Sequence, residues 1–145
     1  MATSQDAELI LKLYELRREE KMRKARDFVF SPEFMPETVD DVMAVFANPE
    51  KSAYVRMVVS YWDMAAAMVN HGSIDAELFY DTNGEYFGVW AKIGHLIPEL
   101  RERISPRFLK NLEVLIQKHP DSAQALERMK AMFRNMAAQA AAAQK

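Results

Sequence analysis

The stretch PEKSAYVRMVVSYWDMAAAMVN, residues 49–70, limits the folds open to this chain more than any other segment. Its apolar residues cover two neighbouring faces of a helix, and a narrow polar line lies between them. The polar line consists of Arg56, Ser60, Asp63 and Asn70. Because a helix that is apolar nearly all round is normally enclosed by other helices, the sequence predicts that residues 49–70 form the central helix of a bundle.

The composition supports an all-α fold around this helix. Good helix formers are abundant, whereas 4 glycines and 6 prolines are few for a turn-rich β-sandwich. A length of 145 residues suits one domain. We therefore predict a single-domain, all-α, irregular bundle of six or seven helices over residues 1–145, in which the alanine-rich residues 137–145 form a weakly ordered tail.

Helix starts are indicated by capping residues that precede a proline or an acidic first turn. Ser4 precedes two acids, so we expect a first helix from there to about residue 28. Asn48 before Pro49 marks the start of the central helix. Pro98 falls inside an apolar helical pattern and predicts a kink or a new helix. Further starts are expected at Ser31, Ser73, Thr82, Ser105 and Asp121.

The stretch NHGSIDAELFYDTNGEYFGVW, residues 70–90, concentrates side chains of the kinds that build metal and catalytic sites. The candidate ligands are His71, Asp75, Glu77 and Asp81, with His95 and Glu99 as a second pair. Gly72, however, is suited to end the central helix in a left-handed conformation. Asp75 and Glu77 then fit the first turn of a short helix. We interpret the stretch as a helical corner, and we assign no metal ligands and no catalytic residues.

A second candidate site combines the polar line of the central helix with this corner. Its candidate pocket residues are Arg56, Ser60, Asp63, His71 and Asp75. A serine nucleophile needs an activating base, and residues 49–70 contain no histidine. Because charge in a crowded interior must be paired, we interpret Arg56, Ser60 and Asp63 as a partly buried hydrogen-bonded line. A pocket near Asp63, His71 and Asp75, in a hydrolase or in a protein that binds a metal or a small molecule, stays open as the alternative.

The segment RREEKMRKAR, residues 17–26, is a candidate basic patch. Its cations are Arg17, Arg18, Lys21, Arg23, Lys24 and Arg26. They wrap around the helix, and Glu20 with Lys24 forms an i, i+4 pair that suits an exposed helix. We interpret the segment as a solvated face. Nucleic-acid binding through this first helix is a second alternative, although the net charge of −2 argues against a protein coated with basic residues.

Methionine is frequent in the chain, with 10 residues in total. Leu126, Met129, Met132, Phe133 and Met136 share one side of the last expected helix. Methionine-rich surfaces also bind partner helices. The stripe therefore predicts either a buried face or a contact between subunits, and the two alternatives stay open.

Several classes of protein are excluded or disfavoured by the same sequence. Without cysteine, the chain has no disulfide, no thiolate zinc site and no cysteine nucleophile. Residues 1–21 do not resemble a signal peptide, and no uncharged run approaches the roughly 20 residues of a membrane-spanning helix. We expect a cytoplasmic protein without membrane insertion and without a cofactor.

Residues 62–90 resemble an uncharacterised bacterial family of small helical domains. The resemblance rests on an aromatic residue and an acid on one helix, a G-x-I-D-x-E-L-x-Y corner, and a following helix with a tryptophan. The matching residues are Trp62, Asp63, Ala65, Gly72, Ile74, Asp75, Glu77, Leu78, Tyr80 and Trp90. Members of the family often carry a membrane-spanning helix ahead of the domain, whereas this chain has a charged first helix. The resemblance implies a helical domain and implies no activity.

Taken together, these features favour a non-enzymatic, cytoplasmic protein-interaction module that self-associates. We expect its partner to be another protein or a second copy of the chain, and we expect no nucleic-acid partner. The discriminating structural question is whether the polar line opens into a pocket or is sealed by neighbouring helices.

Overall fold

All regular secondary structure in the part of the chain that the structure describes is helical. The computed structural model describes residues 1–144, so Lys145, the last residue of the expected tail, lies outside the described residues. The elements are α1 (Ser4–Arg17), α2 (Glu20–Val29), α3 (Val39–Phe46), α4 (Pro49–Asn70), α5 (Ala76–Thr82), α6 (Tyr86–Ile93), the 3₁₀ helix η1 (Gly94–Leu96), α7 (Ile97–Arg103), α8 (Lys110–Lys118) and α9 (Ser122–Ala143). The prediction of an all-α, single-domain bundle is confirmed.

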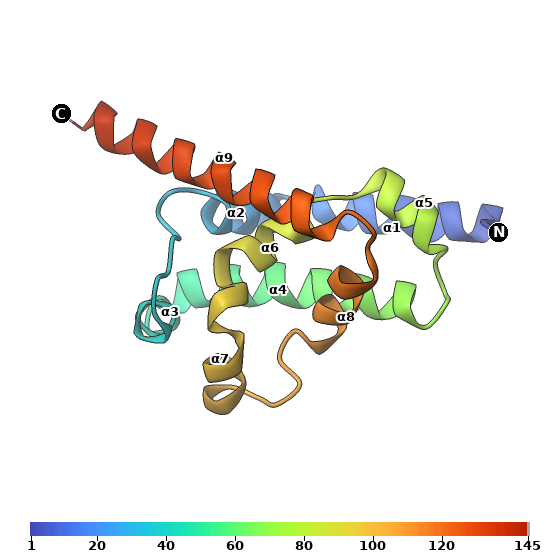
Figure 1. Ribbon diagram of the computed structural model, residues 1–145, viewed down its shortest axis with the longest axis horizontal. Helices are drawn as coiled ribbons and strands as arrows, with labels where there is room; N and C mark the ends of the chain where they lie inside the picture. Colours follow the sequence, from blue (N-terminus) through green and yellow to red (C-terminus); the bar gives the residue numbers. More distant parts are fainter. Residues whose placement is uncertain (145) are drawn as a thin grey trace.

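α4 is the central helix, as predicted (Figure 1). It packs most extensively against α2 on one side and α8 on the other. Its buried residues are Val55, Val58, Val59, Tyr61, Trp62, Ala65, Ala66 and Val69. Trp62 is 1 % exposed and contacts the rings of Tyr61 and Tyr86, with ring centroids 4.9 and 5.8 Å away. The aromatic core therefore joins the middle of α4 to the start of α6.

Residues 1–144 contain nine α-helices, more than the six or seven expected, because two expected helices are each divided. The first divides at Arg18 and Glu19, where the Glu19 side chain accepts a hydrogen bond from the backbone of Met22 (3.2 Å) and caps α2. The other divides at η1, and α7 restarts with Pro98 in its first turn. Proline is tolerated there because the first turn of a helix has no backbone partner for that nitrogen.

Several helices start at residues other than those expected. Thr3 instead of Ser4 caps α1, and it forms a capping box with Asp6. α3 starts after Thr38, whereas Ser31 lies in the preceding loop and donates to the carbonyl of Phe28 (2.7 Å). Each segment offers several residues with capping side chains, and the packing of the helix decides which one is used.

The same holds in the second half of the chain. Asp75 instead of Ser73 caps α5. Thr82 ends α5 rather than opening a helix, and α8 begins at Lys110, five residues after Ser105. Asp121 precedes α9 as expected, but its side chain makes no capping hydrogen bond.

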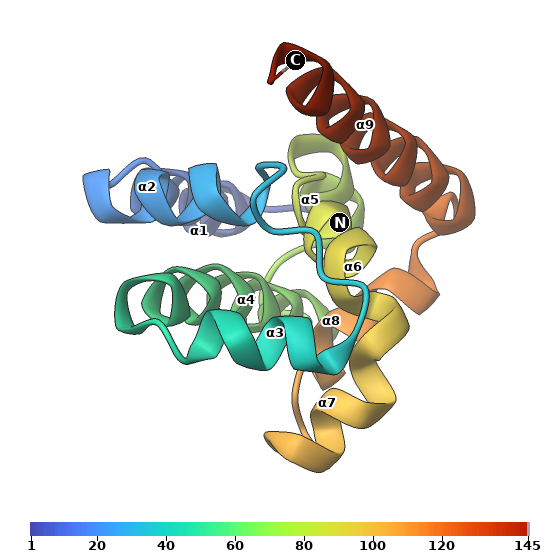
Figure 2. The same cartoon turned by 90° about the vertical axis from the view of Figure 1, so that its left-hand side faces the viewer.

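α9 lies across α6 and then extends beyond the rest of the bundle to the C-terminus (Figure 1). The view in Figure 2 shows that it rises away from the layers formed by α1, α2, α3 and α4. Residues 137–143 of the expected tail continue α9 as helix. Phe133 is the one fully buried residue among residues 122–143. None of the helices in residues 1–144 is long and apolar enough to cross a membrane.

Candidate functional site

Asp63, the central member of the expected polar line, connects α4 to the start of α8. Its carboxylate accepts hydrogen bonds from the backbone of Leu112 (2.9 Å) and from the side-chain amide of Asn111 (3.1 Å). Asn70 donates its side-chain amide to the carbonyl of Asn111 (2.9 Å). Since the first backbone N–H groups of a helix lack partners within the helix, Asp63 serves as a cap for α8 supplied by another helix.

The other two members of the line do not join this network. Arg56 is exposed and donates to the hydroxyl of Ser52 (3.2 Å). Ser60 is exposed and donates to the backbone carbonyl of Arg56 (2.6 Å). The three side chains therefore form neither a pocket nor one hydrogen-bonded line, because their positions on α4 turn Arg56 and Ser60 to the surface and Asp63 toward α8.

The residues of the corner end α4 and cap α5. Gly72 has the predicted left-handed conformation, with φ of 84°. His71 is the C-cap of α4 and its side chain is exposed. Asp75 caps α5 by accepting from the backbone of Leu78 (3.0 Å), and its own backbone N–H donates to Asp6 (2.9 Å). The candidate pocket residues are thus engaged in separate contacts, and residues 1–144 contain no group of three or more acids and histidines able to hold a metal.

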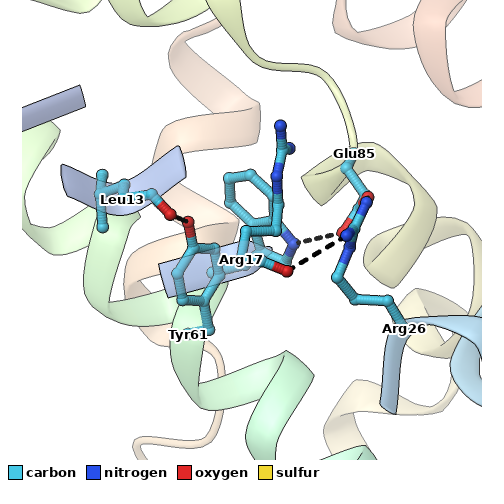
Figure 3. A network of polar contacts seen from close by, with 6 residues as sticks. Leu13, Arg17, Arg26, Tyr61 and Glu85 are labelled. Carbon is cyan, nitrogen blue, oxygen red and sulfur yellow. Dashed lines mark hydrogen bonds and ion pairs between the residues drawn. The ribbon is translucent and has the colours of Figure 1, made fainter. Parts of the chain in front are cut away.

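Arg26 of the basic segment points into the protein, where it pairs with Glu85 (Figure 3). Its Nε and Nη2 atoms lie 3.0 and 2.7 Å from the two Glu85 oxygens. The indole N–H of Trp62 donates to the same carboxylate (3.2 Å). Glu85 therefore joins α2, α4 and α6. Hydrogen bonding to Glu85 raises the pKa of Arg26 above its ordinary value.

The remaining cations of the segment have different surroundings. Arg17 lies over the Trp62 ring, 5.6 Å from its centroid, and its backbone carbonyl accepts from Arg26 (3.3 Å). Lys24 pairs with Glu20 at 3.6 Å on the surface, the i, i+4 pair that was expected. Arg18, Lys21, Arg23 and Lys24 are exposed. The candidate basic patch is therefore reduced to these four side chains.

Phe133 is buried, as the stripe on the last expected helix allowed, but its partners on other helices were not predicted from the sequence. The Phe133 ring stacks on Phe30, with centroids 6.3 Å apart and planes at 3°. The ammonium nitrogen of Lys92 lies 4.3 Å from the Phe133 centroid. A side chain at Gly88 would place its Cβ 2.9 Å from the Phe30 ring and 3.4 Å from Phe133. We call the area formed by Phe30, Gly88 and Lys92 the α9-binding surface.

Lys92 is a buried cation at the centre of this surface. Its side chain is 3 % exposed, and its nitrogen donates to the carbonyls of Ser31 (2.8 Å) and Phe34 (2.6 Å) and contacts the Met35 sulfur (2.9 Å). Burial lowers the pKa of Lys92 to about 8. Lys92 thereby ties the loop after α2 to α6. The sequence signal for this buried position is a lysine inside the apolar pattern of residues 86–97.

Clefts flank α9 on both sides. One has a volume of about 400 Å³ and lies between α9, the corner and His119, whose ring centroid is 4.4 Å from that of Tyr80 and 5.0 Å from that of Phe87. The other has a volume of about 300 Å³ and lies between α9, Lys92 and the loop before α3. Between these clefts, Phe133 is the fully buried residue of α9, and Ala125, Leu126 and Met129 are partly buried against the core.

Most of the chain matches a known protein family. A family model described as "Domain of unknown function (DUF4760)" matches residues 2–119. The chain belongs to the DUF4760 family. This membership confirms the resemblance to an uncharacterised family of helical domains. No curated protein and no solved structure matches the chain.

The extent of the DUF4760 match separates α9 from the other helices. Residues 2–119 include α1 to α8, whereas α9 begins at Ser122. The residues of the α9-binding surface therefore lie within the matched range, whereas α9 lies outside it. Within the domain, Trp62, Asp63, Gly72 and Asp75 hold helices in place through the contacts described above.

Proposed function

We propose that this protein is a non-enzymatic interaction module whose DUF4760 domain binds an amphipathic helix on the α9-binding surface. We further propose that it self-associates by exchange of α9 between two copies. The observation that carries the proposal is that α9, a helix of 22 residues, buries one residue fully, Phe133. A helix that docks in an apolar groove through anchor side chains on one face is a common mode of peptide recognition.

The chemistry of the surface supports recognition of an aromatic anchor. Phe30 supplies a parallel ring, Gly88 leaves the space that the ring occupies, and Lys92 supplies a cation over the ring face. Stacked rings and a desolvated cation near a ring are each worth roughly 0.5–2 kcal/mol. Phe133 is thus the specific part of the contact, and the partly buried Ala125, Leu126 and Met129 add apolar area to it. A terminal helix held in this way can open without unfolding the domain.

A second copy of the chain is the partner that we propose. The linker between α8 and α9 comprises residues 119–121. If it extends, α9 can occupy the α9-binding surface of a second chain through the same contacts that it makes in its own. Exchange of an identical element requires no new complementary surface, which makes it a low-cost route to a dimer. We propose that the protein acts in the cytoplasm. The cytoplasm keeps thiols reduced, and a chain without cysteine needs no disulfide there.

Cysteine cross-linking tests the exchange directly, because the natural chain has no cysteine. Gly84 and Ala125 line the same cleft at the edge of α9, and a side chain at Gly84 meets no atom within 4 Å. We expect the double variant Gly84→Cys with Ala125→Cys to form a product within one chain when treated with a short bismaleimide in dilute solution.

A mixture of the two single-cysteine variants tests whether α9 passes from one chain to another. Chains with Gly84→Cys and chains with Ala125→Cys are mixed, concentrated and then treated. A cross-linked dimer containing one chain of each kind supports exchange of α9, and light scattering should show a dimer fraction that rises with concentration. If the double variant cross-links within the chain while the mixture never yields a dimer, the proposed exchange is wrong.

The two other functions considered from the sequence receive less support. A pocket around Asp63, His71 and Asp75 would need these side chains to converge, whereas each has a different surrounding. Nucleic-acid binding through residues 17–26 would need a continuous cationic face, whereas Arg26 is paired with Glu85. The structure therefore supports these two functions less well than recognition of a helix.

A further inference from the structure

The buried ammonium of Lys92 forms no ion pair with a carboxylate of residues 1–144. Its hydrogen-bond and sulfur contacts are all neutral groups, and the ion pairs within residues 1–144 do not include it. Lys92 lies nine-tenths or more inside the protein, with 3 % of its surface exposed. Because a buried charge is normally paired with an opposite one, this cation is an unusual feature of the core.

The cleft of about 300 Å³ between α6 and α9 borders this cation. The buried Lys92 of α6 and the exposed His95 of η1 line it, and Lys130 and Arg134 line it from α9. Glu37, before α3, is the one carboxylate among the lining residues. The cleft therefore carries three permanently or normally cationic side chains against one acid.

The side chains at the rim are free to change partners. Lys130 lies 3.8 Å from Glu127 in an ion pair whose side chains are 44 % and 72 % exposed, and exposed pairs of this kind contribute little. Arg134 is exposed and takes part in none of the ion pairs within residues 1–144. His95 Nε2 lies 3.2 Å from the carbonyl of Pro36, which leaves its Nδ1 atom for another contact.

We propose that this cleft binds a phosphate group, either free phosphate or the phosphate of a small monoester. Arg134 and Lys130 donate hydrogen bonds to its oxygens from α9, and Lys92 compensates its charge from the core without giving up its carbonyl partners. A guanidinium matches the geometry of phosphate oxygens. Phe133 and Met35 form apolar walls that suit the organic part of a monoester. This site does not depend on the exchange of α9.

Thermal unfolding of the full chain with inorganic phosphate is the first test. We expect a saturable rise in Tm that sodium chloride at equal ionic strength does not reproduce. Arg134→Gln should weaken apparent binding at least about fivefold, the size of one charge-assisted contact. Arg128→Gln is the matched control, because Arg128 is also exposed on α9 but lines the cleft on the other side. An equal phosphate response in both variants would overturn the proposal.

A second measurement reports on Lys92 itself. A bound dianion raises the pKa of Lys92 from about 8, and NMR titration of the lysine side chains with and without phosphate detects this rise. A rise in Tm without any change at Lys92 would assign the phosphate to the protein surface and contradict the site. Lys130→Gln replaces Arg134→Gln if the latter does not fold.

The same titration with phenyl phosphate distinguishes the two sources of phosphate. Tighter binding of phenyl phosphate than of inorganic phosphate identifies a monoester as the ligand, because the apolar walls then contribute. Equal affinities identify free phosphate. Absence of saturable binding of either compound to the natural chain would also overturn the proposal.

Discussion

Glu85 and Arg26 form a two-point ion pair that joins the start of α6 to α2 across 59 positions of the sequence. Their side chains are 19 % and 25 % exposed, so the pair is largely shielded from water. Trp62 donates to the same carboxylate, and Arg26 also donates to the carbonyl of Arg17. The pair therefore connects the ends of α1 and α2 with the central helix and α6.

Replacing Glu85 should destabilise the whole bundle. Glu85→Ala leaves the Arg26 guanidinium shielded and unpaired and removes the acceptor of the Trp62 indole, so we expect a loss of about 3 kcal/mol in the free energy of unfolding. Urea denaturation followed by tryptophan fluorescence measures it. Glu77→Ala, an exposed acid in the first turn of α5, is the control and should cost under about 0.5 kcal/mol. Similar costs for both variants would contradict this role of Glu85.

Removing the Lys92 charge should change how stability depends on pH. The pKa of Lys92 is about 8 in the folded chain and about 10.4 in an unfolded one. Between these pH values the unfolded state therefore binds more protons than the folded state. The contribution of Lys92 to the free energy of unfolding becomes more favourable as pH rises through 8. Relative to Lys92→Met, the natural chain should gain about 2 kcal/mol between about pH 7 and pH 9.5. Parallel pH profiles for the two proteins would show that Lys92 does not titrate in this range.

Truncation of the anchor should release α9 without unfolding the domain. Phe133→Ala removes a buried ring, a change that typically costs 3–5 kcal/mol, and the cost here should fall on α9. We expect hydrogen exchange to accelerate across residues 122–143 while α4 stays protected. Met132→Ala, which alters a side chain 47 % exposed on the same turn, should leave both rates unchanged. Equal acceleration in α4 and α9 would show that α9 is an integral part of the core.

Asp63 should stabilise the protein by capping α8. Asp63→Ala removes the acceptor for the Leu112 backbone and the Asn111 amide, and loss of a helix cap costs about 1–2 kcal/mol. Thermal unfolding should show this loss, and Asp81→Ala at an exposed position of α5 should not. A pocket function for Asp63 would instead predict unchanged or increased stability on its removal, because a carboxylate held for a ligand is not satisfied in the free protein.

Local features of this chain were predictable from the sequence, and contacts between distant residues were not. The central position of residues 49–70, the cap at Asn48 and the left-handed Gly72 were predicted and are confirmed. The role of Asp63 was not, because its partners in α8 lie 48 and 49 positions away. Arg56 and Ser60 belong to the same polar line by spacing, yet they face the surface.

The sequence alone thus determined that the chain forms helices, where the main one lies, and how its ends are capped, since these depend on side chains three or four positions apart. Only the tertiary structure decided that Glu85 pairs with Arg26, that Lys92 is buried against neutral hydrogen-bond partners and that Phe133 is the buried residue of α9. Each of these depends on which helix faces come together. That choice minimises exposed apolar surface over the whole chain, and a window of neighbouring residues does not contain it.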